Sequence, residues 1–200
     1  MPRPFRLALF VLGLGALSPQ AGQAQASPQN LRPTRDVRIT YEVQAEGQGT
    51  RRIPVAWQAA TQRARAEPDG VPGWLLLDLP RNSAQMVLEA QSMVVQLPAG
   101  DLSPLLGGVP PGTKLSAAGS ATVAGHRCTN WRVVRPDTEG TVCLTADGVM
   151  LRAAGQHRGR SGRIEAKAVS YGPQDASRFA IPPGFTPVTL PPALLQGLMR

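Results

Sequence analysis

The chain has 200 residues, a formal net charge of +8 and a hydrophobic fraction of 42%, which suits one domain with a single core. All of its 21 basic residues except Lys114 and Lys167 are arginine, an excess that either follows genome composition or serves an anionic surface. Four Phe, three Trp and two Tyr are few rings for base stacking, so a nucleic-acid partner is excluded.

Residues 1–26 are typical of a secretory signal. Arg3 and Arg6 form its positive start, residues 7–17 its apolar core, and residues 24–26 an A-x-A cleavage site. The apolar core is shorter than the roughly 20 residues that span a bilayer, and no later segment is long enough. No lipid-attachment cysteine follows it. We therefore expect export to the bacterial periplasm as a protein that is not membrane-spanning and begins with a flexible segment, residues 27–35.

Alternation with period two begins at Val37 and predicts a half-buried strand over residues 37–46. A turn signal at residues 47–49 and renewed alternation over residues 53–59 predict a hairpin. Its second strand is expected to continue through residues 61–67, with Arg63 and Arg65 facing outward.

Two runs, residues 74–79 and 86–97, are apolar on both faces in places, so we expect other parts of the chain to cover them on both sides. The breaker-rich segment 98–112 is either a lid or a plain surface loop. Strand patterns then follow at regular spacing, over residues 115–123, 127–134, 141–145, 149–154 and 164–171. The pattern predicts an all-β protein, a long antiparallel meander.

Cys128 and Cys143 are the two cysteines of the chain. In an oxidising compartment such a pair forms a structural disulfide, and its spacing differs from that of redox or zinc motifs. Placed opposite each other across a turn at residues 135–140, the cysteines would link the two strands of one hairpin. Closing this short loop would stabilise the fold by about 3 kcal/mol. His126 and His157 do not complete a four-ligand site with them, so we expect no metal and no cofactor.

Three features together carry a resemblance: the spaced Gly125, Cys128 and Trp131, the segment CLTADGVMLR (143–152), and the closing segment YGPQDASRFAIPPGF (171–185). They resemble an uncharacterised family of small exported bacterial proteins with the half-barrel fold of the periplasmic lipoprotein carrier LolA and its relatives LolB and RseB. The resemblance covers residues 36–186 and leaves residues 187–200 as a tail. It implies a long curved antiparallel sheet whose apolar concave face binds acyl chains.

A carrier of this kind needs more apolar surface than its own core fills. The alternative is that these side chains are ordinary core. Candidates for the ligand-binding face are Trp57, Trp74, Leu75, Leu77, Met86, Leu88, Met93 and Val95. The tail could plug the groove through its leucines or fray as an ordinary terminus.

A second hypothesis is an envelope protein–protein interaction or sensor module with a self-filled core. Arg158, Arg160 and Arg163 would then contact acidic partners or lipid phosphates, unless they are merely a solvated hairpin tip. An enzyme is not expected, because no nucleophile, base and acid share a recognisable spacing. Asp78 and Glu89 are interpreted as surface charges. The sequence favours no particular oligomeric state.

Overall fold

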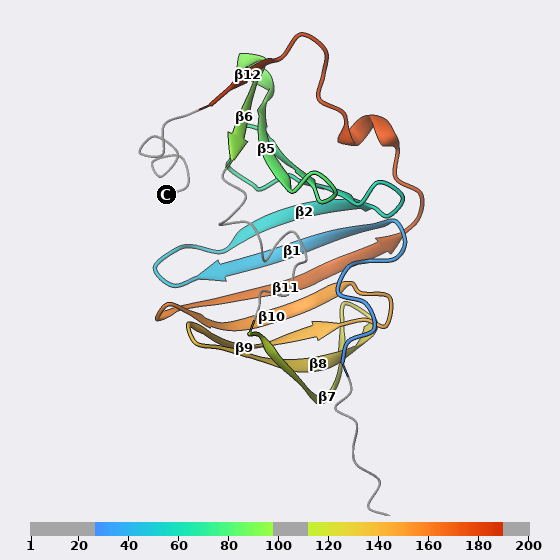
Figure 1. Cartoon of the computed structure of the whole chain (residues 1–200), viewed down its shortest axis with the longest axis vertical. Helices are drawn as coiled ribbons and strands as arrows, with labels where there is room; N and C mark the ends of the chain where they lie inside the picture. The colour runs from blue at the N-terminus through green and yellow to red at the C-terminus, as the bar shows by residue number, and fades with distance from the viewer. Residues whose placement is uncertain (1–26, 98–111, 190–200) are drawn as a thin grey trace, which may run out of the picture.

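The computed structural model describes residues 27–97 and 112–189. Twelve strands form one sheet in the order β12-β6-β5-β4-β3-β2-β1-β11-β10-β9-β8-β7 (Figure 1). The strands are β1 (Val37–Ala45), β2 (Arg51–Gln58), β3 (Arg63–Ala66), β4 (Trp74–Asp78), β5 (Ser83–Leu88), β6 (Met93–Leu97), β7 (Lys114–Val123), β8 (His126–Arg135), β9 (Thr138–Leu144), β10 (Met150–His157), β11 (Arg160–Tyr171) and β12 (Thr186–Val188). Two short 3-10 helices, η1 (Glu89–Gln91) and η3 (Ala176–Phe179), connect strands.

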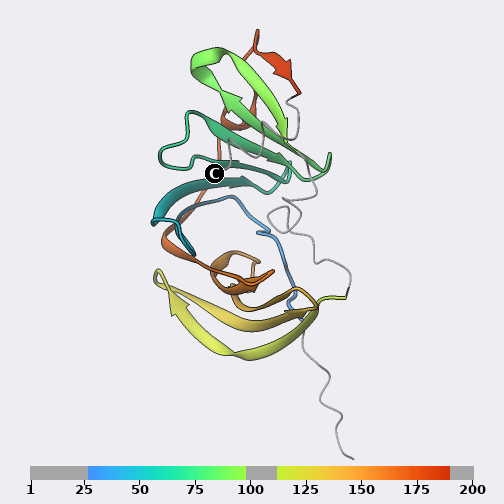
Figure 2. The same cartoon turned by 90° about the vertical axis from the view of Figure 1, so that its left-hand side faces the viewer.

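The sheet joins two antiparallel meanders, β1 to β6 and β7 to β11, through pairing of β1 with β11. The predicted all-β fold is confirmed: the sheet is mostly antiparallel, strongly curved and not closed (Figure 2). The strand order departs from chain order where the two meanders join, because β1 lies in the middle of the sheet. The pairing extends from Val37 opposite Tyr171 to Ala45 opposite Gly162, so β1 has neighbours on both edges.

Several strand boundaries differ from the predicted ones. Residues 86–97 are not one strand, because η1 and the left-handed backbone of Ser92 (φ 50°) separate β5 from β6. β3 is a strand of its own, since the chain reverses at Gln62, which also has a positive φ. Only three residues long, β12 was not predicted; it pairs in parallel with β6, placing Thr186 opposite Met93.

Three glycines lie in register across β9, β10 and β11. Gly140 lies opposite Gly155, which lies opposite Gly162. A Cβ atom on Gly155 would be 2.4 Å from the carbonyl oxygen of Glu139. Glycine therefore permits an approach of neighbouring backbones that any side chain would prevent.

Both faces of strands β2 to β6 carry buried apolar side chains, as the apolar character of residues 74–79 and 86–97 predicts. An inner cluster contains Trp57, Leu77 and Val95, and an outer cluster contains Leu76 and Val87. Residues 27–36 lie against the inner cluster, where the indole Nε1 of Trp57 donates to the carbonyl of residue 33 at 2.8 Å. Figure 2 shows this segment, in dark blue, along the inner side of the curve. η3 packs on the outer cluster.

The Cys128–Cys143 disulfide is present and links β8 to β9, with a Cα–Cα distance of 5.4 Å. The register differs from the predicted one by two residues, because Cys143 lies opposite Asn130 and the bond runs diagonally. The loop is residues 136–137, shorter than predicted, and Gly140 lies inside β9. Two-residue hairpin loops are favoured, and a shift of two residues preserves the face of every side chain.

Candidate ligand-binding face

Seven of the eight candidate residues share the inner face. Trp57, Leu77 and Val95 are buried members of the inner cluster. Leu75, Met86 and Leu88 are partly buried against it, and Met93 lies opposite Leu88 on the neighbouring strand. Whether they bind a ligand stays a prediction.

Trp74 is the exception, since it lies on the outer face and is 2% exposed. Successive residues of a strand point to opposite faces, so Trp74 and Leu75 cannot share one. The indole Nε1 donates to Glu89 at 2.9 Å, and the Arg65 guanidinium lies 3.9 Å from the centre of the ring. The placement of Trp74 on the ligand face is therefore corrected, and Glu89 is a hydrogen-bond partner of a core residue.

Leu75, Met86, Leu88 and Met93 form a contiguous surface that we name the β4–β6 apolar patch. Leu75 lies opposite Met86, and Leu88 lies opposite Met93. All four side chains are partly exposed, whereas Val95, the neighbour of Met86, is 1% exposed. Unbranched methionine side chains adapt to irregular apolar partners. The patch is therefore an apolar surface that can change shape, and it lies beside the buried side chain of Val95.

The turn at residues 145–148, the TADG sequence, anchors the N-terminal segment. The backbone N–H of Thr34 donates to the carbonyl of Asp147 at 3.0 Å, and the side chain of Asn30 donates to the carbonyl of Ala146 at 2.9 Å. Gly148 has a φ of +87°, and a Cβ there would lie 2.1 Å from the carbonyl oxygen of Arg32. The TADG part of the sequence resemblance thus has a structural role, because it holds the N-terminal segment in place.

Asp147 also organises charges at this turn. Its carboxylate accepts from Arg35 Nε at 2.8 Å and from the Tyr171 hydroxyl at 3.3 Å. Burial alone would raise the pKa of Asp147, but the hydrogen bonds from Thr145, Arg35 and Tyr171 outweigh it and lower that pKa. The Arg35 guanidinium lies 3.8 Å from the centre of the Tyr171 ring.

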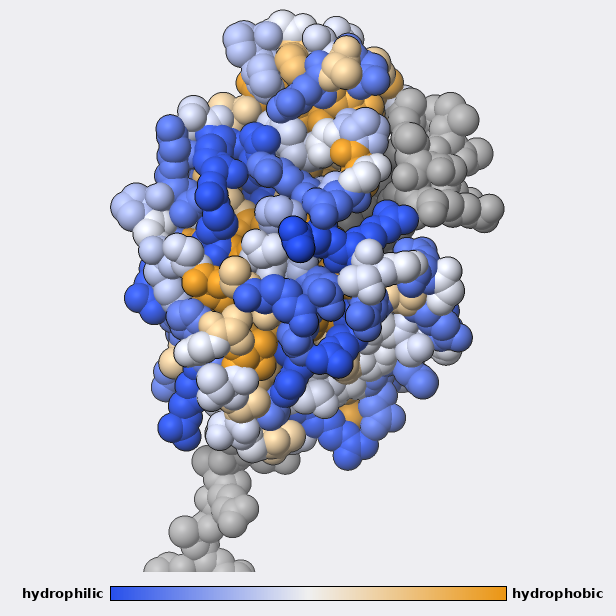
Figure 3. All heavy atoms as spheres, turned by 180° about the vertical axis from the view of Figure 1, so that it is seen from behind, coloured by the Kyte–Doolittle hydropathy of each residue, from blue (hydrophilic) through white to orange (hydrophobic). Residues whose placement is uncertain are grey.

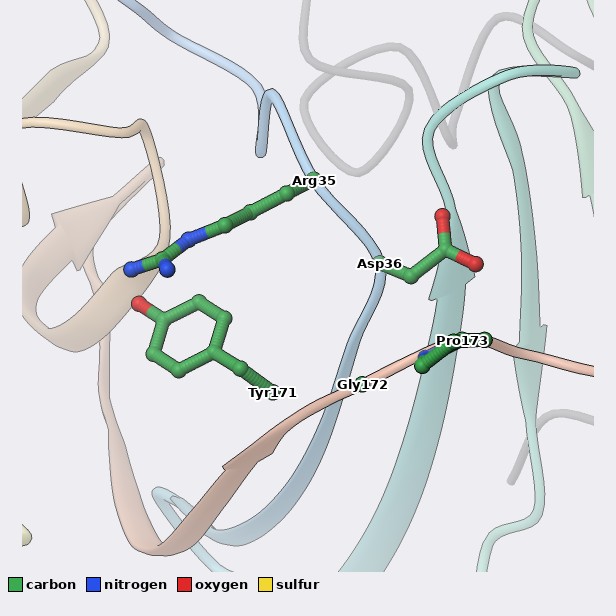
Figure 4. Close-up of a pocket in the computed structure, with 5 residues that line it drawn as sticks. All are labelled: Arg35, Asp36, Tyr171, Gly172 and Pro173. Atoms are coloured by element: carbon green, nitrogen blue, oxygen red, sulfur yellow. The ribbon is translucent and has the colours of Figure 1, made fainter.

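A shallow hollow of about 430 Å³ lies beside this cluster, lined by Arg35, Asp36, Tyr171, Gly172 and Pro173 (Figure 4). The Asp36 carboxylate already accepts from the backbone N–H groups of Ala59 and Gln174, each at 2.8 Å. The charged groups of the hollow are therefore engaged in holding chain segments together. In the described part of the chain, no group of three or more His, Cys, Asp or Glu residues has the arrangement of a metal site.

Asp78 is not the surface charge that the sequence indicated. It is 5% exposed, and its carboxylate lies 3.0 Å from Arg63 Nε and 2.7 Å from an Arg81 nitrogen. Asp78 ends β4 opposite Arg63 of β3, and the following turn brings Arg81 back to it. Burial would raise the pKa of Asp78, but the bonds from Arg81 and Arg63 lower it overall.

The three candidate arginines of the predicted anionic contact are all exposed at the β10–β11 hairpin. Arg163 forms an ion pair with Glu165, and Arg158 lies 3.7 Å from a carboxylate oxygen of Asp137. Arg160 has no ion pair with any residue that the structure describes. Their contact with an anionic partner stays a prediction.

The geometry defines a class: an open, curved β half-barrel with one face partly apolar. No protein-family model matches the chain, and neither does any curated protein sequence. Among solved structures, an uncharacterised conserved protein from Thermus thermophilus is similar, with a TM-score of 0.56 and 11% identity over 78% of this chain and 91% of that one.

MucB of Pseudomonas aeruginosa, solved with MucA, has a TM-score of 0.50 and 16% identity over 72% of this chain. The chain spans 55% of that MucB chain, a little over half. A LolA superfamily protein from Nitrosomonas europaea has a TM-score of 0.38 and 9% identity over 75% of this chain and 92% of that one. The resemblance in fold is confirmed, and the first two matches carry it. Within the described residues, no helix has the length and apolar character needed to cross a membrane.

Proposed function

We propose that the chain is a non-catalytic binding protein of the bacterial envelope that holds a hydrophobic or lipidated ligand on the inner face of its sheet. The β4–β6 apolar patch carries this proposal. Its four partly exposed side chains are contiguous across three strands and lie beside the buried Val95. Sites for acyl ligands are concave and mostly apolar, with few polar anchors.

Two observations support a periplasmic location. Residues 1–26 have the composition of a secretory signal. The disulfide is buried, with Cys128 2% and Cys143 1% exposed, and such bonds persist in oxidising compartments. A carrier working between membranes would meet lipidated ligands there.

A second candidate function is binding of another envelope protein. MucB, which shares the fold, has been solved in complex with MucA. In this chain a partner would place an apolar side chain on the β4–β6 apolar patch, in the position that we assign to an acyl group. Polypeptide and lipid would therefore compete for one surface.

Native mass spectrometry of protein purified from the periplasm without detergent tests the proposal. We expect adducts of lipid mass that disappear after organic extraction. Met93→Asp should abolish them, because a carboxylate in an apolar site loses its hydration. Gln91→Asp places the same charge on an exposed residue two positions away, outside the patch, and should leave the adducts unchanged.

An apo mass for the wild-type protein would contradict lipid binding. If a polypeptide copurifies instead and Met93→Asp releases it, the second function replaces the first. Urea unfolding of both variants separates binding from folding. If Met93→Asp unfolds the protein while Gln91→Asp does not, Met93 is core and the patch does not bind.

A further inference from the structure

Three hairpin tips far apart in the sequence meet at one end of the sheet. They join β1 to β2, β8 to β9 and β10 to β11, and all three lie at the left in Figure 1. We call residues 44–52, 132–139 and 156–163, together with Lys114 at the start of β7, the hairpin-tip edge. We propose that this edge docks on an anionic lipid surface.

Hydrogen bonds tie the three tips into one surface. The backbone N–H of Glu46 donates to the carbonyl of Ser161 at 3.0 Å, and the Ser161 N–H and hydroxyl donate to the Glu46 carboxylate at 3.0 and 2.9 Å. The backbone N–H of Arg158 donates to the carbonyl of Asp137 at 2.8 Å. The backbones of the three tips are therefore held together, and their charged side chains extend from one surface.

The edge has a large excess of positive charge. It contains eight Lys and Arg residues against the carboxylates of Glu46, Asp137 and Glu139. Those carboxylates are engaged within the edge: Glu46 accepts from Ser161, and Glu139 lies 2.6 Å from an Arg132 nitrogen.

Asp137 is shared between two arginines, Arg135 at 3.4 Å and Arg158 at 3.7 Å. Among the residues that the structure describes, Arg51, Arg52 and Arg160 form no ion pair. The cations that remain are exposed and available to an external anion.

The chemistry of the tips favours lipid headgroups over an acidic protein. The turns of the edge, residues 46–52, 135–138 and 157–161, include no large apolar side chain, and the remaining edge residues add only Val133 and Val134, both half-buried. At the right of Figure 3, where this edge comes into view, mainly hydrophilic and intermediate residues cover it. Stable protein interfaces depend on buried aromatic or apolar anchors, whereas headgroups attract basic residues by charge alone.

Vesicle flotation tests the docking. Vesicles of phosphatidylcholine mixed with phosphatidylglycerol should bind the full chain, and vesicles of phosphatidylcholine alone should not. Binding should weaken steeply as salt shortens the Debye length. Arg51→Gln with Arg160→Gln should weaken binding roughly 25-fold, since each cation near an anionic surface contributes about fivefold.

Arg38→Gln with Arg127→Gln is the matched control. Both arginines are exposed, lie near the opposite ends of their strands, and form no ion pair within the described part of the chain. This variant has the same net charge as the first and should bind nearly as well as the wild type.

Equal loss in both variants would overturn the proposal, because net charge alone would then explain binding. Failure of anionic vesicles to bind, with retention of an acidic envelope protein, would overturn it in favour of a protein partner. Native mass spectra of the Arg51/Arg160 variant should still show the inner-face ligand, since the edge lies outside the β4–β6 apolar patch. The two proposals can therefore fail independently.

Discussion

At the scale of single residues, Gly148 fixes the path of the N-terminal segment. Its positive φ is unfavourable for L-residues other than glycine, and the carbonyl of Arg32 occupies the space that a Cβ would need. Gly125, in the β7–β8 turn, has a similar φ of +79°, but no atom lies within 4 Å of the position that a Cβ would take there. The two glycines thus differ in one respect, the close approach of the N-terminal segment.

Gly148→Ala should therefore destabilise the protein more than Gly125→Ala. Placing alanine at a positive φ should cost each variant roughly 1–2 kcal/mol of stability. The contact with Arg32 should add a further loss of about 1 kcal/mol or more at Gly148, because backbone atoms must shift. Urea midpoints of the two variants measure the difference. Equal midpoints would show that the segment moves aside without cost.

At the scale of elements, residues 172–185, which follow β11, cover the outer face of strands β2 to β6. Phe179 of η3 is 1% exposed in the outer cluster, with Ile181 and Phe185 packed against the same cluster. This path brings β12 to the edge of β6, where the backbone N–H of Thr186 donates to the carbonyl of Ser92 at 2.9 Å. The closing segment of the sequence resemblance, residues 171–185, therefore covers this face and leads into the edge strand β12.

Phe179→Ala should cost about 3–5 kcal/mol, the usual range for a fully buried phenylalanine. It should also detach β12, since three residues of parallel pairing are too few to hold alone. Hydrogen exchange provides the measurement: protection of Thr186 should fall more than that of β1. Phe179→Leu is the control, and it should lose less folding stability and less protection at Thr186. Unchanged protection at Thr186 would mean that β12 is held independently of η3.

At the scale of the whole molecule, buried and paired carboxylates determine the response to acid. Hydrogen bonds from Arg163 and Lys167 lower the pKa of Glu165 to about 2. The pKa values of Asp78 and Asp147 are lowered as well, despite burial. A carboxyl group with a lowered folded-state pKa stabilises the fold above its unfolded pKa, near 4, and that stabilisation is lost as the pH falls towards the folded value.

The urea midpoint should therefore hold at neutral pH and decrease below about pH 4. Asp147→Asn should lower the midpoint at pH 7 and reduce its dependence on pH, because one of the linked groups is gone. Asp69→Asn, at an exposed turn residue that forms no ion pair with the described residues, should retain the wild-type pH profile. Identical pH profiles for Asp147→Asn and wild type would contradict this assignment.

Much of the local structure was predictable because its causes are local. Alternation placed Val37 and Ile39 on one face of a strand, and β1 begins and ends close to the predicted limits. The disulfide followed from two cysteines in a chain that the sequence predicts to be exported. Trp74 was misplaced because hydrophobicity alone does not say which face a strand residue occupies when both faces are buried. Asp78 was misplaced because its two arginine partners come from a neighbouring strand and a turn.

The sequence by itself determined the all-β class, the faces of the regularly alternating strands and the cysteine pair, since side-chain period and redox chemistry act over a few residues. Tertiary structure alone decided that β1 pairs with β11, that residues 27–36 bind the TADG turn, and that three hairpin tips form one basic edge. Those contacts join segments up to more than a hundred residues apart. Strand pairing among them rests on backbone hydrogen bonds, and because every residue except proline carries the same donor and acceptor, the side-chain pattern does not specify the partner strand. The side-chain bonds that add to them, such as Arg35 to Asp147, form only once the fold has brought the two segments together.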